Sequence, residues 1–473
     1  MLEKNSFFVR KFPLPSLSFL TSLLLLGPVP ATVFGERQFS KLWGENGELW
    51  EQGGILRDFT EVGYMRGEAP IPDWPVWKLI TDFGAVPNDK KSDLQAIKDA
   101  IAACPPYHAI GIPNGRFIID DVLEVSANNI VIRGESRDGA ILFFPIHMKE
   151  IYPGYSQSFE SFIQFHGGEN RGLENLSLIL RDEQKATGYV PPPREVRKQR
   201  ARHWYYSGEN FVSFRGGETN SWMRDVYLKN GNHVIRVGGR GTGQITLQNL
   251  VLDNFVNRTM VEDSTDGHMG IQVSSGAERI LVHNVLLTGI YNHDITPMGA
   301  RFSVFSNIRG PNVELDHHAM GNEGNLFTEI DIGYGSRGYG ENHNNMDETY
   351  WGLKGYKEGR ITPPKTRNIF VGLNVDEPDD FREKYWVEAI DPDALHPQNL
   401  YLAQLAFFGK PLPETPELKL PKAPVGAPVR LIPTDDSWVN QRSKGKNMGN
   451  HGNLVAKAAR RKSVREALMK FDL

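Results

Sequence analysis

The chain contains a single cysteine, Cys104, among its 473 residues. An intrachain disulfide is therefore excluded, and a zinc–thiolate centre is not expected. Neither an HExxH motif nor the loop spacing of an EF-hand occurs, so the common local signatures of zinc and calcium sites are missing. Positive and negative side chains are nearly equal in number, with 53 Lys and Arg against 57 Asp and Glu, which gives a formal net charge of −4. This balance predicts no nucleic-acid partner.

Long apolar runs are also scarce. The one candidate lies between Leu17 and Gly35, follows three basic residues, and is broken by Pro28 and Pro30. It is shorter than the roughly 20 apolar residues that a membrane span needs. The alternative is a single membrane anchor, but a basic flank, a short apolar centre and small residues are typical of a secretory signal peptide. We therefore expect an exported protein, secreted or periplasmic/extracellular, with no membrane span after signal cleavage.

Short β-branched fragments return about every 23 residues through the middle of the chain. Each fragment places one polar residue between apolar neighbours, namely Asn175, Asp225, Asn249, Asn284, Asn307 and Glu329. The steps between the last five are 24, 35, 23 and 22 residues. A period of roughly 20 to 50 residues is typical of solenoids, whereas the strands of a β-sandwich follow one another every 8 to 12 residues or so. The pattern predicts stacked parallel strands in which these polar residues form a ladder.

A helical pattern precedes the first strands. Leu94, Ile97 and Ile101 follow one another at helical spacing, and Ser92 with Gln95 has the form of a capping box. We expect this helix to close one end of the solenoid, which would otherwise expose its apolar cross-section.

The same region resembles a known superfamily. The stretch DFGAVPNDKKSDLQAIKDAIAAC and the following GIPNGRF lie within residues 82–117. They resemble the opening of the pectate-lyase-like parallel β-helix proteins, in the rhamnogalacturonase and epimerase-like form of that motif. The matching positions are Asp82, Phe83, Gly84, Ala85, Asp93, Ala96, Ile97, Ala100, Pro113 and Gly115. The resemblance covers residues 76 to 375, approximately. It implies an all-β, single-stranded right-handed parallel β-helix that acts on polysaccharides as a lyase, hydrolase or epimerase.

The chain departs from the better-known branches of that superfamily. Gly267-His268-Met269 only echoes the glycine–histidine motif of polygalacturonases, and no Arg-x-Lys follows it. No clear match to the arginine base and calcium-binding aspartates of pectate lyases is present, so no branch is assigned. We divide the chain into a signal peptide (1–35), a lead-in segment (36–75), the β-helix with its N-terminal capping helix (76–390), a C-terminal helix with a proline-rich extension (391–440) and a basic tail (441–473).

The candidate site residues gather between residues 263 and 351. The histidines 268, 293, 318 and 343 recur at a period of 25, and carboxylates accompany them. Counted from the ladder, His293 and Asp316 each lie nine residues past Asn284 and Asn307, so we expect them to stack. The predicted catalytic residues are His268, His293, Asp294, Asp316, His317, His318, Arg301 and Arg337. The predicted substrate-binding residues are Asp266, Tyr291, Tyr339, Glu341, Asn342, His343 and Trp351.

These residue types fit more than one chemistry. An imidazole beside a carboxylate is an oriented general base, as β-elimination on a uronic acid requires, with an arginine such as Arg301 or Arg337 on the substrate carboxylate. Paired carboxylates such as Asp294 and Asp316 fit a glycoside hydrolase. Non-catalytic glycan binding is a third reading, and polar side chains that only satisfy turns a fourth. The aspartates could also hold Ca²⁺, and three histidines with an aspartate could bind zinc or a similar ion; no cofactor is assigned. We favour the lyase, with a polysaccharide substrate.

Overall fold

The computed structural model describes one compact unit within residues 38–473. The described residues are 42–54, 56–146, 148–151, 160–181, 210–253, 269–288, 291, 293–310, 313, 315–317, 321–331, 349–351, 369–371, 387–388, 399–411, 413 and 415–419. The expected signal peptide and basic tail lie outside them.

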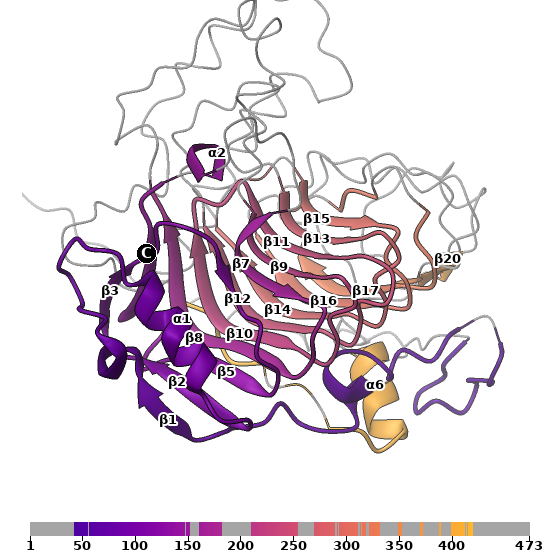
Figure 1. The fold of residues 1–473 in the computed structure, drawn as a ribbon. Coiled ribbons are helices and arrows are strands. Elements are labelled where there is room, and N and C mark those ends of the chain that lie inside the picture. The colour runs from indigo at the N-terminus through magenta and orange to yellow at the C-terminus, as the bar shows by residue number, and fades with distance from the viewer. Residues whose placement is uncertain are drawn as a thin grey trace, which may run out of the picture. The chain divides into compact units, whose positions relative to one another are not determined.

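Two parallel sheets make up this unit (Figure 1). The 14-stranded sheet contains β1 (Val76–Leu79), β2 (His108–Ile112), β3 (Gly115–Ile118), β5 (Ile130–Gly134), β6 (Ala140–Phe144), β8 (Arg171–Leu180), β10 (Trp222–Lys229), β12 (Thr246–Asp253), β14 (Leu281–Leu287), β16 (Val304–Arg309), β17 (Leu326–Asp331), β18 (Thr349–Trp351), β19 (Ile369–Val371) and β20 (Val387–Glu388). The six-stranded sheet contains β4 (Leu123–Glu124), β7 (Ser161–His166), β9 (Asn210–Arg215), β11 (His233–Gly238), β13 (Met269–Ser274) and β15 (His293–Met298).

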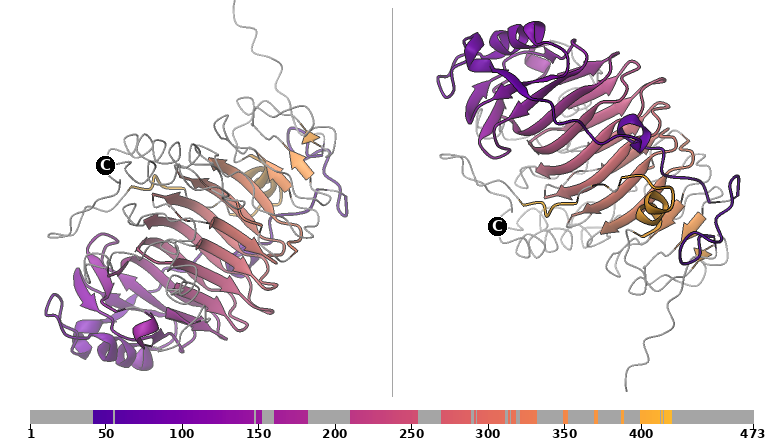
Figure 2. Two further views of the ribbon diagram at one scale, coloured as in Figure 1. Left: turned by 90° about the horizontal axis from the view of Figure 1, so that it is seen from above. Right: turned by 90° about the horizontal axis from the view of Figure 1, so that it is seen from below.

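The chain alternates between the two sheets, so that one strand from each makes one coil. β7 leads to β8, β9 to β10 and β11 to β12, and each strand pairs in parallel with its equivalent in the next coil. Single bridges along Glu169, Thr219, Gly243, Glu278, Arg301 and Glu323 form a third column. Figure 2 shows the successive coils side by side. The predicted all-β parallel β-helix is confirmed.

Identical positions of successive coils fill the interior with similar side chains. Phe165 stacks on Phe214 with ring centroids 4.8 Å apart. Phe305 stacks on Phe327 at 4.9 Å in a later pair of coils. These stacks and the valines at equivalent positions, such as Val237 and Val273, bury apolar surface from coil to coil, so the core lengthens with the solenoid instead of widening.

The predicted polar ladder is confirmed. All six of its members have left-handed backbones, with φ between 49° and 56°. Asn249 Nδ2 donates to Asp225 Oδ1 at 3.0 Å, and Asn284 Nδ2 donates to Asn249 Oδ1 at 2.9 Å. Asn307 Nδ2 donates to Asn284 Oδ1 at 3.1 Å. Asn and Asp tolerate the left-handed region better than other side chains, which explains why they recur where the 14-stranded sheet bends.

The expected capping helix is α1 (Leu94–Ala103), which buries Leu94, Ile97 and Ile101 against the first coil. Its capping box was wrongly predicted, because Asp93 rather than Ser92 is the N-cap residue and makes no side-chain cap. The Asp93 carboxylate instead accepts hydrogen bonds from the backbone of Val86 and Ile118, both at 2.8 Å.

Segments from both ends of the described chain cover the outside of the 14-stranded sheet. Helix α6 (Asn399–Phe407) and the lead-in segment pack there through Phe59, Leu281 and Leu400. The remaining short helices are η1 (Tyr64–Gly67), η2 (Ile80–Phe83) and α2 (Met148–Ile151). Within the described residues, no helix is both long enough and apolar enough to cross a membrane.

Candidate functional site

The outward side of the six-stranded sheet is the candidate site. In its strands two consecutive residues belong to the core, such as Phe211 with Val212 and Val234 with Ile235. Side chains otherwise alternate along a strand. The residue before each core pair and the residues one and three positions after it therefore point outward. We call these outward rows the outer polar face: Ser161, Asn210, His233, Met269 and His293; Gln164, Ser213, Arg236, Gln272 and Thr296; His166, Arg215, Gly238, Ser274 and Met298.

Polar side chains dominate this face, although parallel sheets are commonly apolar on both sides. The middle row is polar in all five strands, and Ser213 and Thr296 within it are fully buried. Gln272 is 3% exposed, and its Nε2 donates to the thioether of Met298 at 3.4 Å. Among the described residues, Gln272 Oε1 and Thr296 Oγ1 have no hydrogen-bond partner. Buried polar atoms are rarely left without partners, so these two are unusual.

His293 and Asp316 meet at one end of the outer polar face. His293 Nδ1 lies 2.9 Å from Asp316 Oδ2, and the two side chains are 12% and 5% exposed. The Asp316 amide donates to the Ile295 carbonyl at 2.8 Å, which fixes the carboxylate beside β15. The predicted contact of this pair is present, but the predicted register is wrong: Leu315 bridges Ile295, so Asp316 follows in line with Thr296 rather than His293. The contact is an ion pair when the imidazole is protonated, and it brings together two groups of the kind used in acid–base chemistry.

His317 points the other way, into the coil. Its ring is fully buried, 5.2 Å from the Phe327 ring and with Nδ1 3.2 Å from Asn322 Nδ2. Burial lowers the pKa of His317 to about 3, partly offset by Asp316. The imidazole is neutral and belongs to the core, so its predicted catalytic role is not supported.

Three further predicted residues also lie away from the His293–Asp316 pair. Asp294 is 2% exposed. In the register it takes the core position that Val234 has in β11, so its side chain points to the other side of β15 from that of His293. Tyr291 is buried and donates its hydroxyl to the Asp253 carbonyl at 3.0 Å, so its ring is no platform for a sugar.

Arg301 forms an ion pair with Glu323 at 2.7 Å in the turn that follows β15. The six residues of β15 lie between the position of His293 and this turn, which is roughly 16 to 20 Å of extended strand. It therefore cannot neutralise a substrate carboxylate held beside His293.

The remaining predicted residues lie outside the described part of the chain: His268, His318, Arg337, Asp266, Tyr339, Glu341, Asn342 and His343. Trp351 belongs to β18. The 25-residue histidine period does not match the register, because Met269 rather than His268 lies opposite His293. No group of three His, Cys, Asp or Glu side chains within the described residues could hold a metal ion.

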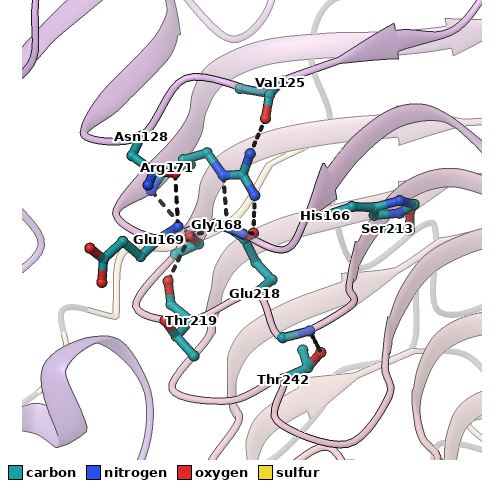
Figure 3. Close-up of polar contacts among 12 residues, drawn as sticks. Val125, Asn128, His166, Gly168, Glu169, Arg171, Ser213, Glu218, Thr219 and Thr242 are labelled. Carbon is teal, nitrogen blue, oxygen red and sulfur yellow. Dashed lines mark hydrogen bonds and ion pairs between the residues drawn. The ribbon is translucent and has the colours of Figure 1, made fainter.

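Sequence reasoning missed the basic part of the outer polar face. His166 lies opposite Arg215, and Ser213 lies opposite Arg236. His166 Nε2 is 2.8 Å from Ser213 Oγ (Figure 3). His166 and Arg215 are 49 residues apart, outside the 23-residue period. An internal repeat was the available signal, since SFIQFHGGE and NFVSFRGGE place the two residues at the same position.

A buried ion pair holds the turns that follow β7 and β9 (Figure 3). Arg171 is 1% exposed, bonds Glu218 through Nε at 2.9 Å and through a second guanidinium nitrogen, and also donates to the Val125 carbonyl. Glu218 accepts a further bond from the Gly168 amide at 2.8 Å. Because these partners satisfy both charges, the pair positions the strand ends that carry His166 and Arg215.

Comparison with known proteins finds the fold in diverse settings. No protein-family model matches the chain, and no curated protein matches its sequence. Among solved structures, the family 28 exopolygalacturonase of Yersinia enterocolitica is 14% identical, with a TM-score of 0.36 over 67% of this chain and 70% of its own. The surface adhesin PfbA of Streptococcus pneumoniae is 11% identical, with a TM-score of 0.39 over 63% and 84%.

The ORF18 protein of Geobacillus virus E2 is 12% identical, with a TM-score of 0.40 over 64% of this chain. The chain spans 60% of the length of that viral protein. These matches are distant, and the chemistry of this chain has to be argued from its own residues.

Proposed function

We propose that the chain is an exported polysaccharide lyase that cleaves a uronate-containing glycan by β-elimination. The outer polar face would bind the glycan, and His293 with Asp316 would carry the chemistry. The observation that supports this proposal most directly is the 2.9 Å contact between His293 Nδ1 and Asp316 Oδ2 on an outward row of polar side chains.

The chemistry assigns one role to each group. Asp316 positions the His293 imidazole through the contact at Nδ1, and His293 Nε2 removes the proton from the carbon next to the substrate carboxylate. The freed electron pair forms a carbon–carbon double bond as the glycosidic carbon–oxygen bond breaks, and the leaving oxygen takes a proton from solvent. Thr296 Oγ1 and Gln272 Nε2, opposite each other in register, are the donors assigned to the charge that develops on the carboxylate.

The basic residues of the outer polar face favour an acidic glycan. Arg215 and Arg236 lie on neighbouring strands, and His166 and His233 lie on the flanking positions of the same face. Guanidinium groups bind carboxylates through paired, charge-assisted hydrogen bonds.

Two alternatives make different predictions. A glycoside hydrolase needs two carboxylates on either side of the scissile bond, and the core position of Asp294 weighs against its pairing with Asp316. A non-catalytic glycan-binding β-helix needs only the polar face and no acid–base pair.

The test is an assay of the full chain on polygalacturonate, alginate and hyaluronan. A lyase raises the near-ultraviolet absorbance and the reducing ends together, because each cut makes one unsaturated end. The His293→Ala and Asp316→Asn variants should lose about a hundredfold or more in rate. Arg301→Gln, away from the face, is the matched control. Reducing ends without absorbance would indicate hydrolysis, and binding without cleavage would indicate a glycan-binding protein.

A further inference from the structure

Tyr107, directly before β2, holds a large exposed ring on a backbone conformation that tyrosine rarely adopts. Its φ is 63°, in the left-handed region, and the residue is 57% exposed. The register aligns it with Asn129, Asn170 and Asn220 of the next three coils, which have φ of 58°, 58° and 49°. Asn adopts this conformation more easily than Tyr does. The choice of tyrosine is therefore not explained by the backbone.

Two later members of the same column, Arg279 and Phe302, are also large, and the lead-in segment contacts both. Arg279 Nη1 lies 2.9 Å from Glu61 Oε2, and the Arg57 guanidinium lies 5.2 Å from the centre of the Phe302 ring. These two residues are only partly exposed. Tyr107 also contacts the lead-in segment, but more than half of the residue remains open to solvent. Internal packing therefore uses only part of its ring.

A row of aromatic rings supports Tyr107 from behind. Trp74 meets Tyr107 edge-to-face with ring centroids 5.5 Å apart, and Trp222 meets Trp74 at 5.7 Å. Tyr64 continues the row, 5.1 Å from Trp222. Trp222 is fully buried and donates its indole N–H to Glu174 at 3.0 Å. The row is thus anchored at its inner end and exposed at its outer end. We call Tyr107 and Trp74 the aromatic platform.

An exposed carboxylate adjoins the aromatic platform. Asp73 precedes Trp74, and its side chain is 85% exposed. Arg133 fixes this corner, because Nη2 lies 2.9 Å from Asp73 Oδ1 and Nη1 donates to the Trp74 carbonyl at 2.7 Å. The Arg133 side chain is only 17% exposed and also pairs with Glu174. The carboxylate is therefore the charge that this pair presents to solvent. It accepts protons from hydroxyl groups and repels an anion.

We propose that the aromatic platform binds a neutral hexose ring of a glycan, at a site separate from the outer polar face. The apolar face of the sugar stacks on the Tyr107 ring, and Asp73 accepts hydrogen bonds from its hydroxyls. Tyr and Trp provide large contact areas at a low cost in conformational entropy. Backbone strain of the kind found at Tyr107 persists mainly where a ligand site uses it.

The platform does not depend on the function proposed above. β2, which follows Tyr107, belongs to the 14-stranded sheet, whereas the outer polar face belongs to the six-stranded sheet. A glycan on the platform is therefore bound away from His293. Binding of a neutral glycan should be the same in the parent and in His293→Ala, so failure of the lyase proposal leaves the platform intact.

The first experiment measures binding of cellohexaose, a neutral β-linked hexose chain, to the full chain by calorimetry. Tyr107→Asn removes the ring but suits the left-handed backbone, and it should weaken binding about tenfold. Its melting temperature should change little, since relief of strain offsets the lost contact with Trp74. Tyr107→Phe keeps the ring and should bind nearly as tightly as the parent. No binding by the parent, or equal binding by Tyr107→Asn, would overturn the site.

Phe407 of α6 provides a matched control. It is 53% exposed and meets Trp43 edge-to-face at 5.6 Å, much as Tyr107 meets Trp74. Phe407→Ala should bind cellohexaose like the parent, and an equal loss of binding in this variant would overturn the assignment to Tyr107. Sedimentation tests the other occupant. A parent that dimerises and a Tyr107→Asn variant that does not would show that the ring binds a second copy of the chain instead of a sugar.

The second experiment tests the preference for a neutral sugar. The galacturonate hexamer is measured in the His293→Ala background, where cleavage does not affect the readout. Any binding that Tyr107→Asn removes belongs to the platform, and this component should be about tenfold weaker than for cellohexaose. Asp73→Asn should narrow the difference, because it removes the repelling charge. Equal Tyr107-dependent affinities for the two hexamers would overturn the assignment to neutral sugars.

Discussion

Asp316 and His317 are consecutive in the chain and face opposite sides of the coil. Asp316 holds His293 on the outside at 2.9 Å, whereas His317 packs against Phe327 inside, with ring centroids 5.2 Å apart. One residue of difference thus separates an oriented acid–base pair from a core side chain, because adjacent side chains of extended backbone point in opposite directions.

The buried histidines predict a pH-dependent stability. Burial lowers the pKa of His317 to about 3 and that of His283 to about 4, from 6.5. Below pH 6.5 the unfolded chain binds protons that the folded chain refuses, so the free energy of unfolding falls as the pH falls from 6.5 towards 4. The slope should approach 1.4 kcal/mol per pH unit for each histidine, roughly. Denaturant melts of His283→Gln and His317→Gln at pH 8 and pH 5 check this. Each variant should show a shallower pH dependence than the parent, and an unchanged slope contradicts the assignment.

The polar ladder predicts a contrast between two substitutions of one residue. Asn284 bonds Asn249, Asn307 and the Pro416 carbonyl, with φ of 52°. Asn284→Ala loses these bonds and keeps a side chain in the left-handed region, so it should cost about 2 to 4 kcal/mol of unfolding free energy. Asn284→Gly loses the same bonds without that strain and should be about 1 kcal/mol more stable than the alanine variant. Equal melting temperatures for the two variants would show that backbone strain plays no part.

The parts of the fold that repeat in every coil could be predicted from sequence. The ladder was found because each coil needs a left-handed residue at one bend, and Asn or Asp marks that bend along the chain. Counting from the ladder also brought His293 and Asp316 together, although the bridge between Ile295 and Leu315 shows a register three residues away from that count. Alternation along extended backbone separates His317 from Asp316, but it does not tell which of the two points into the coil.

The basic end of the outer polar face escaped prediction for a different reason. His166 and Arg215 are direct neighbours in space, but the 49 residues between them exceed the usual coil length. A search based on one period therefore separates them. The histidine period failed because it is one residue too long. The histidines recur every 25 residues, whereas His293 pairs with Met269, which lies 24 residues before it.

The buried pair of Arg171 and Glu218 predicts a strongly non-additive double mutant. Both side chains are nearly or fully buried and charged. Arg171→Met alone leaves Glu218 unpaired in the interior, and should cost about 3 to 5 kcal/mol of unfolding free energy. Arg171→Met combined with Glu218→Gln removes both charges and should recover a large part of that loss. A double-mutant cycle from denaturant melts measures the coupling; additive losses would mean that the two charges act independently.

The close approach of Gly270 on β13 to the backbone of β15 predicts that the position of His293 depends on this glycine. A Cβ on Gly270 would lie 2.3 Å from the Asp294 carbonyl oxygen, a backbone atom that cannot rotate away. Gly270→Ala should therefore push β15 from β13, cost about 1 to 3 kcal/mol in stability, and lower activity by displacing His293. Gly238→Ala is the matched control on β11, because its Cβ would meet Ser274 Oγ at 2.6 Å, the end of a side chain that can rotate. Melts and the glycan assay on both variants check this. If Gly238→Ala loses as much activity and stability as Gly270→Ala, the pair does not depend on the contact between β13 and β15.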